Sequence, residues 1–177
     1  HLPVVRSACG TGPRATDCDF ARLLADTAPV VSGADLAICH LEVPVVAPGR
    51  RVSGYPLFGA PRSLPRGLAA VGWDRCSTAS NHSLDQGIAG IEATLDALDA
   101  AGLGHTGTAR HADEAVPVLF DVNGVRIAHL SASYGFNGLS RPKDEPWRAN
   151  VIDAGRLVTQ ARAARTRAAA HARRGAV

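Results

Sequence analysis

Residues 73–87 read WDRCSTASNHSLDQG, and this stretch decides the fold prediction. Its first seven residues have the short apolar character of a buried β-strand. The stretch then places Asn81, His82 and Asp85 within five residues, although Asn and His are poor strand formers. Gly87 lets the backbone turn into a helical pattern. A strand, a polar turn and a helix in this order predict an α/β protein with a site beyond the strand's carboxyl end.

Short apolar runs alternate with helical patterns on both sides of this stretch. Strands are predicted over 35–42 and 73–79, and a hairpin over 116–133, where Asn123-Gly124 suits a tight turn. Helices are predicted over 19–31, 63–72 and 87–102, and from about Asp153 onwards. Strands that alternate with helices, together with one hairpin, imply a layered α/β domain.

Length and composition are those of one globular domain. The chain has 177 residues, of which 46% are hydrophobic and 20% charged, values that are ordinary for a soluble domain with a sizeable core. No apolar run reaches the ~20 residues that a membrane-spanning helix needs. The formal net charge of +3 is too small to indicate a nucleic-acid partner. An arginine-rich run over 161–174 is interpreted as a solvated helix face or as a surface for an anionic polymer.

The four cysteines match the spacing of no zinc or redox motif. Cys39 and Cys76 fall in predicted strands and are interpreted as small core residues. Cys9 and Cys18 flank a predicted loop, and they could pair if the compartment is oxidising.

The polar turn offers residues for both metal binding and proton transfer. The side-chain carbonyl of Asn81 is a neutral hard ligand for Mn, Fe, Zn or Mg. His82 could donate a proton to a leaving oxygen, and Asp85 could hold the other ring nitrogen and fix the tautomer. In the alternative interpretation, Asn81 and Asp85 only cap the helix that follows. The spacing alone leaves both interpretations open.

Glu42 and His40 form a second candidate group, at the end of the other predicted strand. A carboxylate at the end of an apolar strand is costly unless it is paired or bound to metal, so Glu42 is either a metal ligand or an exposed loop residue. His40 is either a ligand or a core imidazole. Three other histidines have no partner pattern and are interpreted as structural or exposed: His105, His111 and His129.

Five stretches of the chain, in this order, resemble the CapA proteins. They are ADLAICHLEVPV, GYPLFGAP, VGWDRCSTASNHSLDQG, GIEATLDALDAAGLGHTGTAR and VNGVRIAHLSASYGFNG, and the resemblance covers residues 19–160. CapA proteins are poly-γ-glutamate capsule biosynthesis proteins related to calcineurin-like metallophosphoesterases. The resemblance implies a layered α/β/β/α sandwich of the metallophosphoesterase type. It also implies work on poly-γ-glutamate, or a similar anionic polymer, at the cell envelope or the extracellular face of the membrane.

The resemblance also assigns expected roles to residues. It implies that Glu42 and Asn81 are ligands of divalent metal ions and that His82 is the acid that helps the leaving group, with Asp85 beside it. His40, a possible further ligand, stands where the family usually has Asn.

Ser80 likewise replaces a family Asn. Tyr134 and Asn137 match a later tract of the family and are interpreted as lining of the substrate pocket.

Two parts of the family pattern are missing from this sequence. Family members begin with a strand that ends in Gly-Asp and end with strands that carry further His ligands. Residues 1–177, which contain no Met, are therefore expected to be a partial domain, incomplete at both ends, with half of a two-metal site and no activity alone. Membrane association is possible through parts that are absent.

Three functions stay open for the parent protein. The first is metal-dependent hydrolysis of an ester or amide in the polymer. The second is a polymer-binding or assembly role without catalysis. The third is a metallophosphatase or nucleotidase role on a phosphoester.

Overall fold

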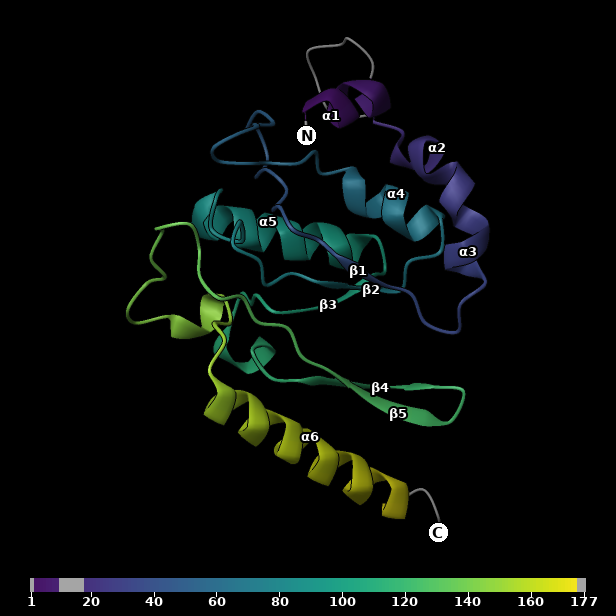
Figure 1. Cartoon of the computed structure of the whole chain (residues 1–177), viewed down its shortest axis with the longest axis vertical. Helices are drawn as coiled ribbons and strands as arrows, with labels where there is room; N and C mark the ends of the chain where they lie inside the picture. Colours follow the sequence, from purple (N-terminus) through teal and green to yellow (C-terminus); the bar gives the residue numbers. More distant parts are fainter. Residues whose placement is uncertain (1, 10–17, 175–177) are drawn as a thin grey trace.

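Three short parallel strands form the sheet that positions the candidate site (Figure 1). The computed structural model describes residues 2–9 and 18–174. The strands are β1 (Ile38–His40), β2 (Arg75–Ser77) and β3 (Gly104–Thr106), in the order β1-β2-β3. The register places Cys39 of β1 opposite Cys76 of β2. Each parallel pair needs a crossover connection, and helices supply both.

The helices that the structure describes are α1 (Leu2–Cys9), α2 (Phe20–Leu24), α3 (Ala28–Ser32), α4 (Leu64–Ala70), α5 (Gly87–Ala100) and α6 (Ala154–Arg174). Short 3₁₀ turns cover Ala25–Thr27, Ala112–Glu114 and Pro146–Arg148. None of the described helices is long and apolar enough to span a lipid bilayer.

The crossover helix α5 forms the core with the parallel sheet. Ile91, Leu95 and Leu98 are at most 1% exposed, and they pack in one cluster with Cys39 and Cys76. This is the apolar face that the sequence predicts, because residues three and four apart lie on the same side of a helix. Burying each of these large side chains contributes about 1.5–3 kcal/mol.

The predicted hairpin is confirmed as β4 (Val118–Val122) and β5 (Val125–His129). Asn123 and Gly124 have φ angles of 50° and 80°, as a tight two-residue turn requires. In Figure 1 the hairpin lies on the opposite side of the parallel sheet from α4 and α5. It contacts β2 through the Arg75 guanidinium, which lies 4.4 Å from the centre of the Phe120 ring.

Helix α6 packs on the hairpin and lies beyond it in Figure 1. Asp153 caps its first turn, because Asp153 Oδ1 accepts a hydrogen bond of 2.8 Å from the Arg156 N–H, and this agrees with the predicted start. Ala164 is fully buried, while Arg162 and Arg165 are exposed. The helix therefore presents arginines to solvent along its outer side. The mixed α/β class is confirmed.

The helix predicted over 19–31 is wrong in detail, because the structure breaks it. Helix α2 ends at Leu24, and α3 starts again at Ala28 with Pro29 in its first turn. Proline has no N–H to donate, and its ring clashes with the carbonyl group four residues earlier, here that of Ala25. A continuous helix through this point is therefore disfavoured.

Two disulfides join the four cysteines. The pairing considered for Cys9 and Cys18 is present, with their Cα atoms 4.0 Å apart, while the loop predicted between them lies outside the described residues. Cys39 and Cys76 are buried core residues, as predicted, and a disulfide that was not predicted joins them. They are opposite each other on neighbouring strands, with a Cα–Cα distance of 4.4 Å. This bridge fastens the two strands whose ends carry the candidate residues.

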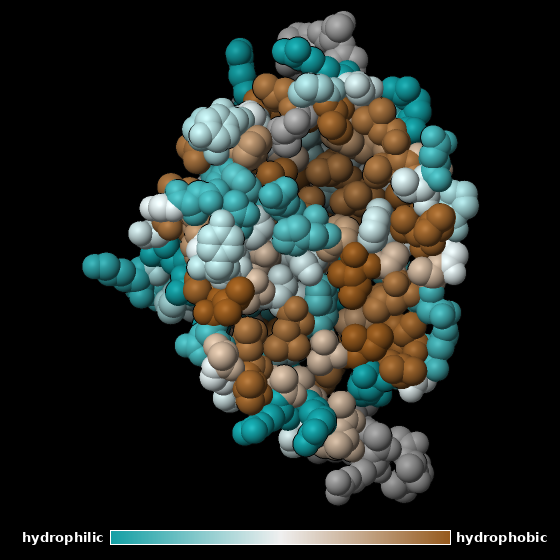
Figure 2. Space-filling view, in the orientation of Figure 1, coloured by the Kyte–Doolittle hydropathy of each residue, from teal (hydrophilic) through white to brown (hydrophobic). Residues whose placement is uncertain are grey.

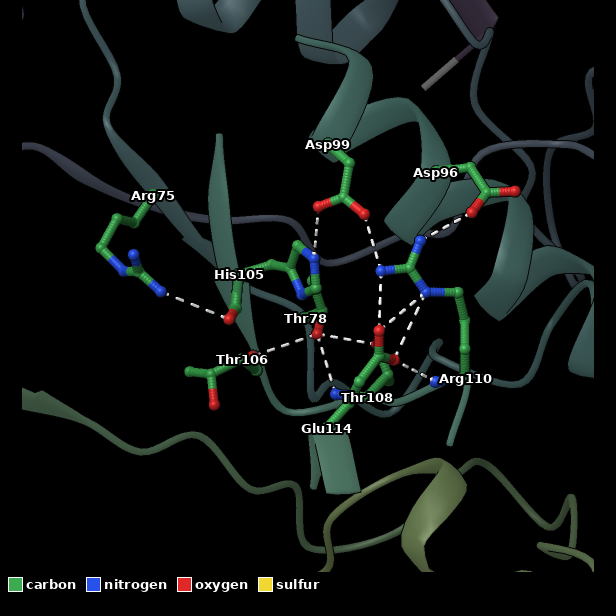
Figure 3. A network of polar contacts seen from close by, with 9 residues as sticks. All are labelled: Arg75, Thr78, Asp96, Asp99, His105, Thr106, Thr108, Arg110 and Glu114. Atoms are coloured by element: carbon green, nitrogen blue, oxygen red, sulfur yellow. Dashed lines mark hydrogen bonds and ion pairs between the residues drawn. The ribbon is translucent and has the colours of Figure 1, made fainter. Parts of the chain in front are cut away.

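Arg110 holds the segment after β3 against α5 (Figure 3). Its guanidinium contacts Asp96 at 2.7 Å, Asp99 at 2.6 Å and Glu114 at 2.7 Å. Burial by itself raises the pKa of Asp99 and Glu114, but hydrogen bonds from Arg110 outweigh burial and hold both pKa values below their ordinary range. His105 contributes to the network through a 2.9 Å contact with Asp99. Its predicted structural role is therefore confirmed.

His129 is a buried histidine that joins the hairpin to the sheet. Its Nε2 lies 3.0 Å from Ser77 Oγ, and burial, reinforced by the charge of Arg75, lowers the pKa of the ring. The unfolded chain therefore binds a proton more readily than the folded protein. The stability that His129 contributes is present above the ordinary His pKa of 6.5 and is lost as the pH falls from there through the folded pKa.

We expect urea midpoints of the wild-type protein to fall between pH 7.5 and pH 5.5 by more than those of a His129→Gln variant. Gln keeps a partner for Ser77 but cannot be protonated. Equal falls in both proteins would show that His129 does not cause the loss.

Candidate functional site

The loops after β1 and β2 meet at the carboxyl ends of the strands. Ser80 Oγ donates a hydrogen bond of 2.6 Å to the carbonyl oxygen of Glu42, which joins the two loops. Ser83 Oγ accepts from the Ser80 N–H at 2.8 Å and lies 2.8 Å from the Thr78 carbonyl oxygen. All three side chains that close this turn, Thr78, Ser80 and Ser83, are buried. The turn that follows β2 is therefore rigidly held.

His82 and Asp85 form a short hydrogen-bonded pair within this turn. His82 Nδ1 lies 2.7 Å from Asp85 Oδ2, and the Asp85 side chain is only 1% exposed. A carboxylate can only accept, so Nδ1 carries the proton and Nε2 is the nitrogen left for another partner. The ring edge of Phe58 supports the imidazole, with centroids 4.8 Å apart and planes at 84°. The pair thus fixes both the tautomer and the orientation of His82.

Asp85 does not cap the helix that follows. Its Oδ2 accepts from the Phe58 N–H at 2.7 Å as well as from His82. The N-cap position of α5 is Gln86, which makes no side-chain cap bond. Two roles were predicted for Asp85, a hydrogen bond to the His82 ring and a cap on the following helix. The structure shows the first. Its Oδ1 is buried without a hydrogen-bond partner.

Two asparagine side chains complete the group from distant parts of the chain. Asn81 Nδ2 donates to Asn137 Oδ1 at 3.2 Å, and Asn137 Nδ2 lies 3.4 Å from His82 Nδ1. The second contact adds little, because His82 Nδ1 already donates to Asp85. Asn137 has a φ of 50°, a left-handed conformation that Asn tolerates better than most residues. Asn81, His82, Asp85 and Asn137 are called the His82 cluster below.

The other predicted site residues do not join the His82 cluster. His40 and Glu42 are exposed and alternate with the buried residues Cys39 and Leu41. The side chains of His40 and Glu42 therefore lie on the same face of this extended segment. Their side chains make no hydrogen bond or ion pair with the described residues. Tyr134 is 76% exposed on the segment that leads to Asn137.

The metal ions that the resemblance implies do not fit the donors of the described residues. Within residues 2–9 and 18–174, no three His, Cys, Asp or Glu side chains lie close enough together to hold an ion. Glu42 offers one carboxylate and Asn81 one side-chain carbonyl oxygen, which the hydrogen bond from Asn81 Nδ2 to Asn137 leaves available. A divalent ion needs several such ligands around it, so Glu42 and Asn81 alone are too few to hold one.

We expect this 177-residue chain to show no stoichiometric binding of Mn²⁺ or Zn²⁺ at micromolar concentrations in calorimetric titrations. Too few donors converge to replace the ion's hydration shell. Stoichiometric binding that is lost in a Glu42→Gln variant would contradict this expectation and restore the predicted site.

The sequence alone does not mark Phe58 or a groove beside Asp85. The groove has a volume of about 660 Å³ and includes Arg50, Arg51 and Gln86 in its lining. Phe58 lies in GYPLFGAP, one of the resembling stretches, and that is the signal that could have drawn attention to it. Adjacent arginines in a long Gly- and Pro-rich loop are the only sequence sign of the groove.

These observations define an α/β domain with a polar His–Asp cluster at the carboxyl ends of parallel strands. Residues 5–175 match the family model of the bacterial capsule synthesis protein PGA_cap, so the chain belongs to this family. The family assignment made from the resembling stretches is therefore confirmed, and it implies involvement in capsule synthesis.

Two curated proteins of Sinorhizobium fredii (strain NBRC 101917 / NGR234) are similar to part of the chain. They are the uncharacterized proteins y4sH and y4uA, each 35% identical over 78 residues. The matched part is 44% of this chain and 17% of each relative, so it spans about a sixth of their length.

Proposed function

We propose that this protein acts on an anionic capsule polymer, poly-γ-glutamate or a similar chain, at the cell envelope. Within that role, His82 transfers the proton in hydrolysis of an ester or amide bond. The 2.7 Å bond between His82 and Asp85 is the observation that carries the proposal. A buried carboxylate that orients an imidazole whose side chain is still 15% exposed is an arrangement suited to general acid or base work.

The proposed step assigns a task to each member of the His82 cluster. His82 Nε2 takes a proton from water as the water attacks the carbonyl carbon of the polymer. It then gives that proton to the leaving nitrogen or oxygen as the bond from this atom to the carbon breaks. Asp85 stabilises the protonated ring before the transfer and keeps Nδ1–H in place afterwards. Asn81 and Asn137 present amide groups that can hydrogen-bond to a polymer backbone.

The finer fold assignment is part of the same proposal. The order of α4 and α5, the parallel sheet, the hairpin and α6 supports an α/β/β/α sandwich of the metallophosphoesterase type (Figure 1). Membership of that superfamily would make divalent ions part of the chemistry. Glu42 and Asn81 would need further donors from outside the described residues.

A polymer-binding or assembly role without catalysis is the second candidate. It is favoured by the absence of a three-donor group among the described residues and by His40 and Ser80 at positions where the family usually has Asn. A binder would need the exposed asparagine amides but no proton transfer. The variant His82→Gln separates the two candidates, because Gln can hydrogen-bond but cannot carry a proton.

The test replaces the chromosomal gene with one that encodes His82→Gln and measures cell-bound capsule polymer and its chain length. If His82 transfers a proton, we expect the rate of polymer hydrolysis to fall about 100-fold or more. The amount or chain length of the cell-bound polymer should then differ from that of the wild-type strain. His111→Gln is the matched control, because His111 is exposed and its side chain makes no hydrogen bond or ion pair with the described residues. Wild-type polymer in the His82→Gln strain would favour the binding role. A loss of phosphoester turnover alone would favour a phosphatase.

A further inference from the structure

A groove lies beside Asp85, between the loop that follows β1 and the start of α5. Arg50, Arg51 and Ser53 line it from the loop, and Asp85 and Gln86 line it from the turn before α5. Its volume of about 660 Å³ lies within the range of small-molecule sites. In Figure 2 hydrophilic surface gathers over this end of α5, while apolar patches lie mainly to its right and below. These five residues are called the arginine groove.

The two arginines of the groove lack the carboxylate partners that Arg110 and Arg148 have. Arg110 and Arg148 are each held by carboxylates at 2.6–2.9 Å. Arg50 and Arg51 are exposed, and their guanidiniums make no ion pair or hydrogen bond with the described residues. Two adjacent guanidiniums without counter-charges attract anions, and their forked donors match carboxylate oxygens.

The polar wall of the groove is built and fixed. Gln86 Nε2 lies 3.0 Å from both Ser53 Oγ and the Phe58 carbonyl oxygen, which ties the loop to the start of α5. Asp85 is the one acid in the lining, and its Oδ2 is engaged by His82 and Phe58.

We propose that the arginine groove is a subsite that binds the free carboxylates of an amide- or ester-linked polyanion, beside the bond presented to His82. This rests on the proposed function, since Asp85 is shared by the groove and the His82 cluster. Arg50 and Arg51 pair with carboxylates of the chain, and the neighbouring backbone bond passes over the imidazole. The subsite therefore selects polymers that carry a charge on each repeat.

The test measures the binding of fluorescein-labelled oligo-γ-glutamate to the purified protein by anisotropy. Arg50→Gln/Arg51→Gln is expected to weaken binding about tenfold or more, because two charge-assisted contacts are lost. Arg162→Gln/Arg165→Gln is the matched control. It removes the same charge from exposed positions on α6 and is expected to change binding less than about twofold, the screened effect of distant charges. Unchanged melting temperatures verify that both variants fold.

The outcomes separate the ligand sources and the two claims. Unlabelled poly-γ-glutamate should compete with the labelled oligomer, whereas uncharged dextran should not. Competition by inorganic phosphate at equal charge would assign the groove to phosphate and overturn the carboxylate proposal. No binding by the wild-type protein, or equal loss in the α6 control, would also overturn it. His82→Gln should bind normally. Normal capsule polymer in the His82→Gln strain, combined with lost binding in the Arg50/Arg51 variant, would leave the subsite standing and remove the catalytic proposal.

Discussion

The Asp85→Asn variant is expected to turn over the polymer about 100-fold or more slowly than the native protein does. Asp85 Oδ2 now accepts from both the His82 ring and the Phe58 N–H. The side-chain oxygen of Asn can take the place of Oδ2 and accept both hydrogen bonds, but the amide carries no negative charge. A neutral partner no longer stabilises the protonated imidazole through which the proposed step passes, so proton transfer slows.

The measurement is the rate at which new chain ends appear when the variant is incubated with polymer. Asp113→Asn is the control, because Asp113 is exposed in the 3₁₀ turn Ala112–Glu114 and makes no ion pair with the described residues. Urea denaturation is recorded in parallel. Unchanged turnover with lowered stability would mean that Asp85 serves only to hold the Phe58 segment in place.

Removal of the Cys39–Cys76 disulfide is expected to cost about 3–4 kcal/mol of unfolding free energy in the chain-entropy model. The bridge closes a segment with a sequence separation of 37, against 9 for Cys9–Cys18. A longer loop has more freedom to lose in the unfolded state, so the bridge between β1 and β2 should contribute more than the other. A typical domain is stable by only about 5–15 kcal/mol, so this loss is large.

The measurement compares urea denaturation of Cys39→Ala/Cys76→Ala and Cys9→Ala/Cys18→Ala with the wild-type protein. The second variant is expected to lose about 2–3 kcal/mol, in line with its shorter loop. If the strand variant unfolds at the wild-type urea concentration, the bridge does not stabilise the sheet.

The elements with strong local patterns could be predicted from the sequence. The apolar face of α5 and the Asn123-Gly124 turn follow from periodicity and turn chemistry, and both are observed. Strand β3, which was not predicted, covers only Gly104–Thr106, and it is a strand because it pairs with β2. Three residues carry too little pattern to reveal that pairing. The disulfide of the sheet depends on the same pairing, since it joins residues of two strands in register.

The candidate site follows the same division between local and distant contacts. His82 and Asp85 are three residues apart, so their contact follows from the spacing within one turn. Asn137 is 55 residues from His82, and only the resemblance pointed to it. The arginine groove was missed because it needs the loop after β1 to fold against the start of α5. Tertiary contacts of this kind leave no periodic signal in the sequence.

The most direct test of the proposed function is size-exclusion chromatography of poly-γ-glutamate after incubation with the native protein or its His82→Gln variant. Because proton transfer by His82 is the proposed step, the native protein should shorten the polymer, and the variant should leave its elution unchanged over the same time. Equal shortening by both proteins would show that His82 is not the proton-transfer group and would contradict the account.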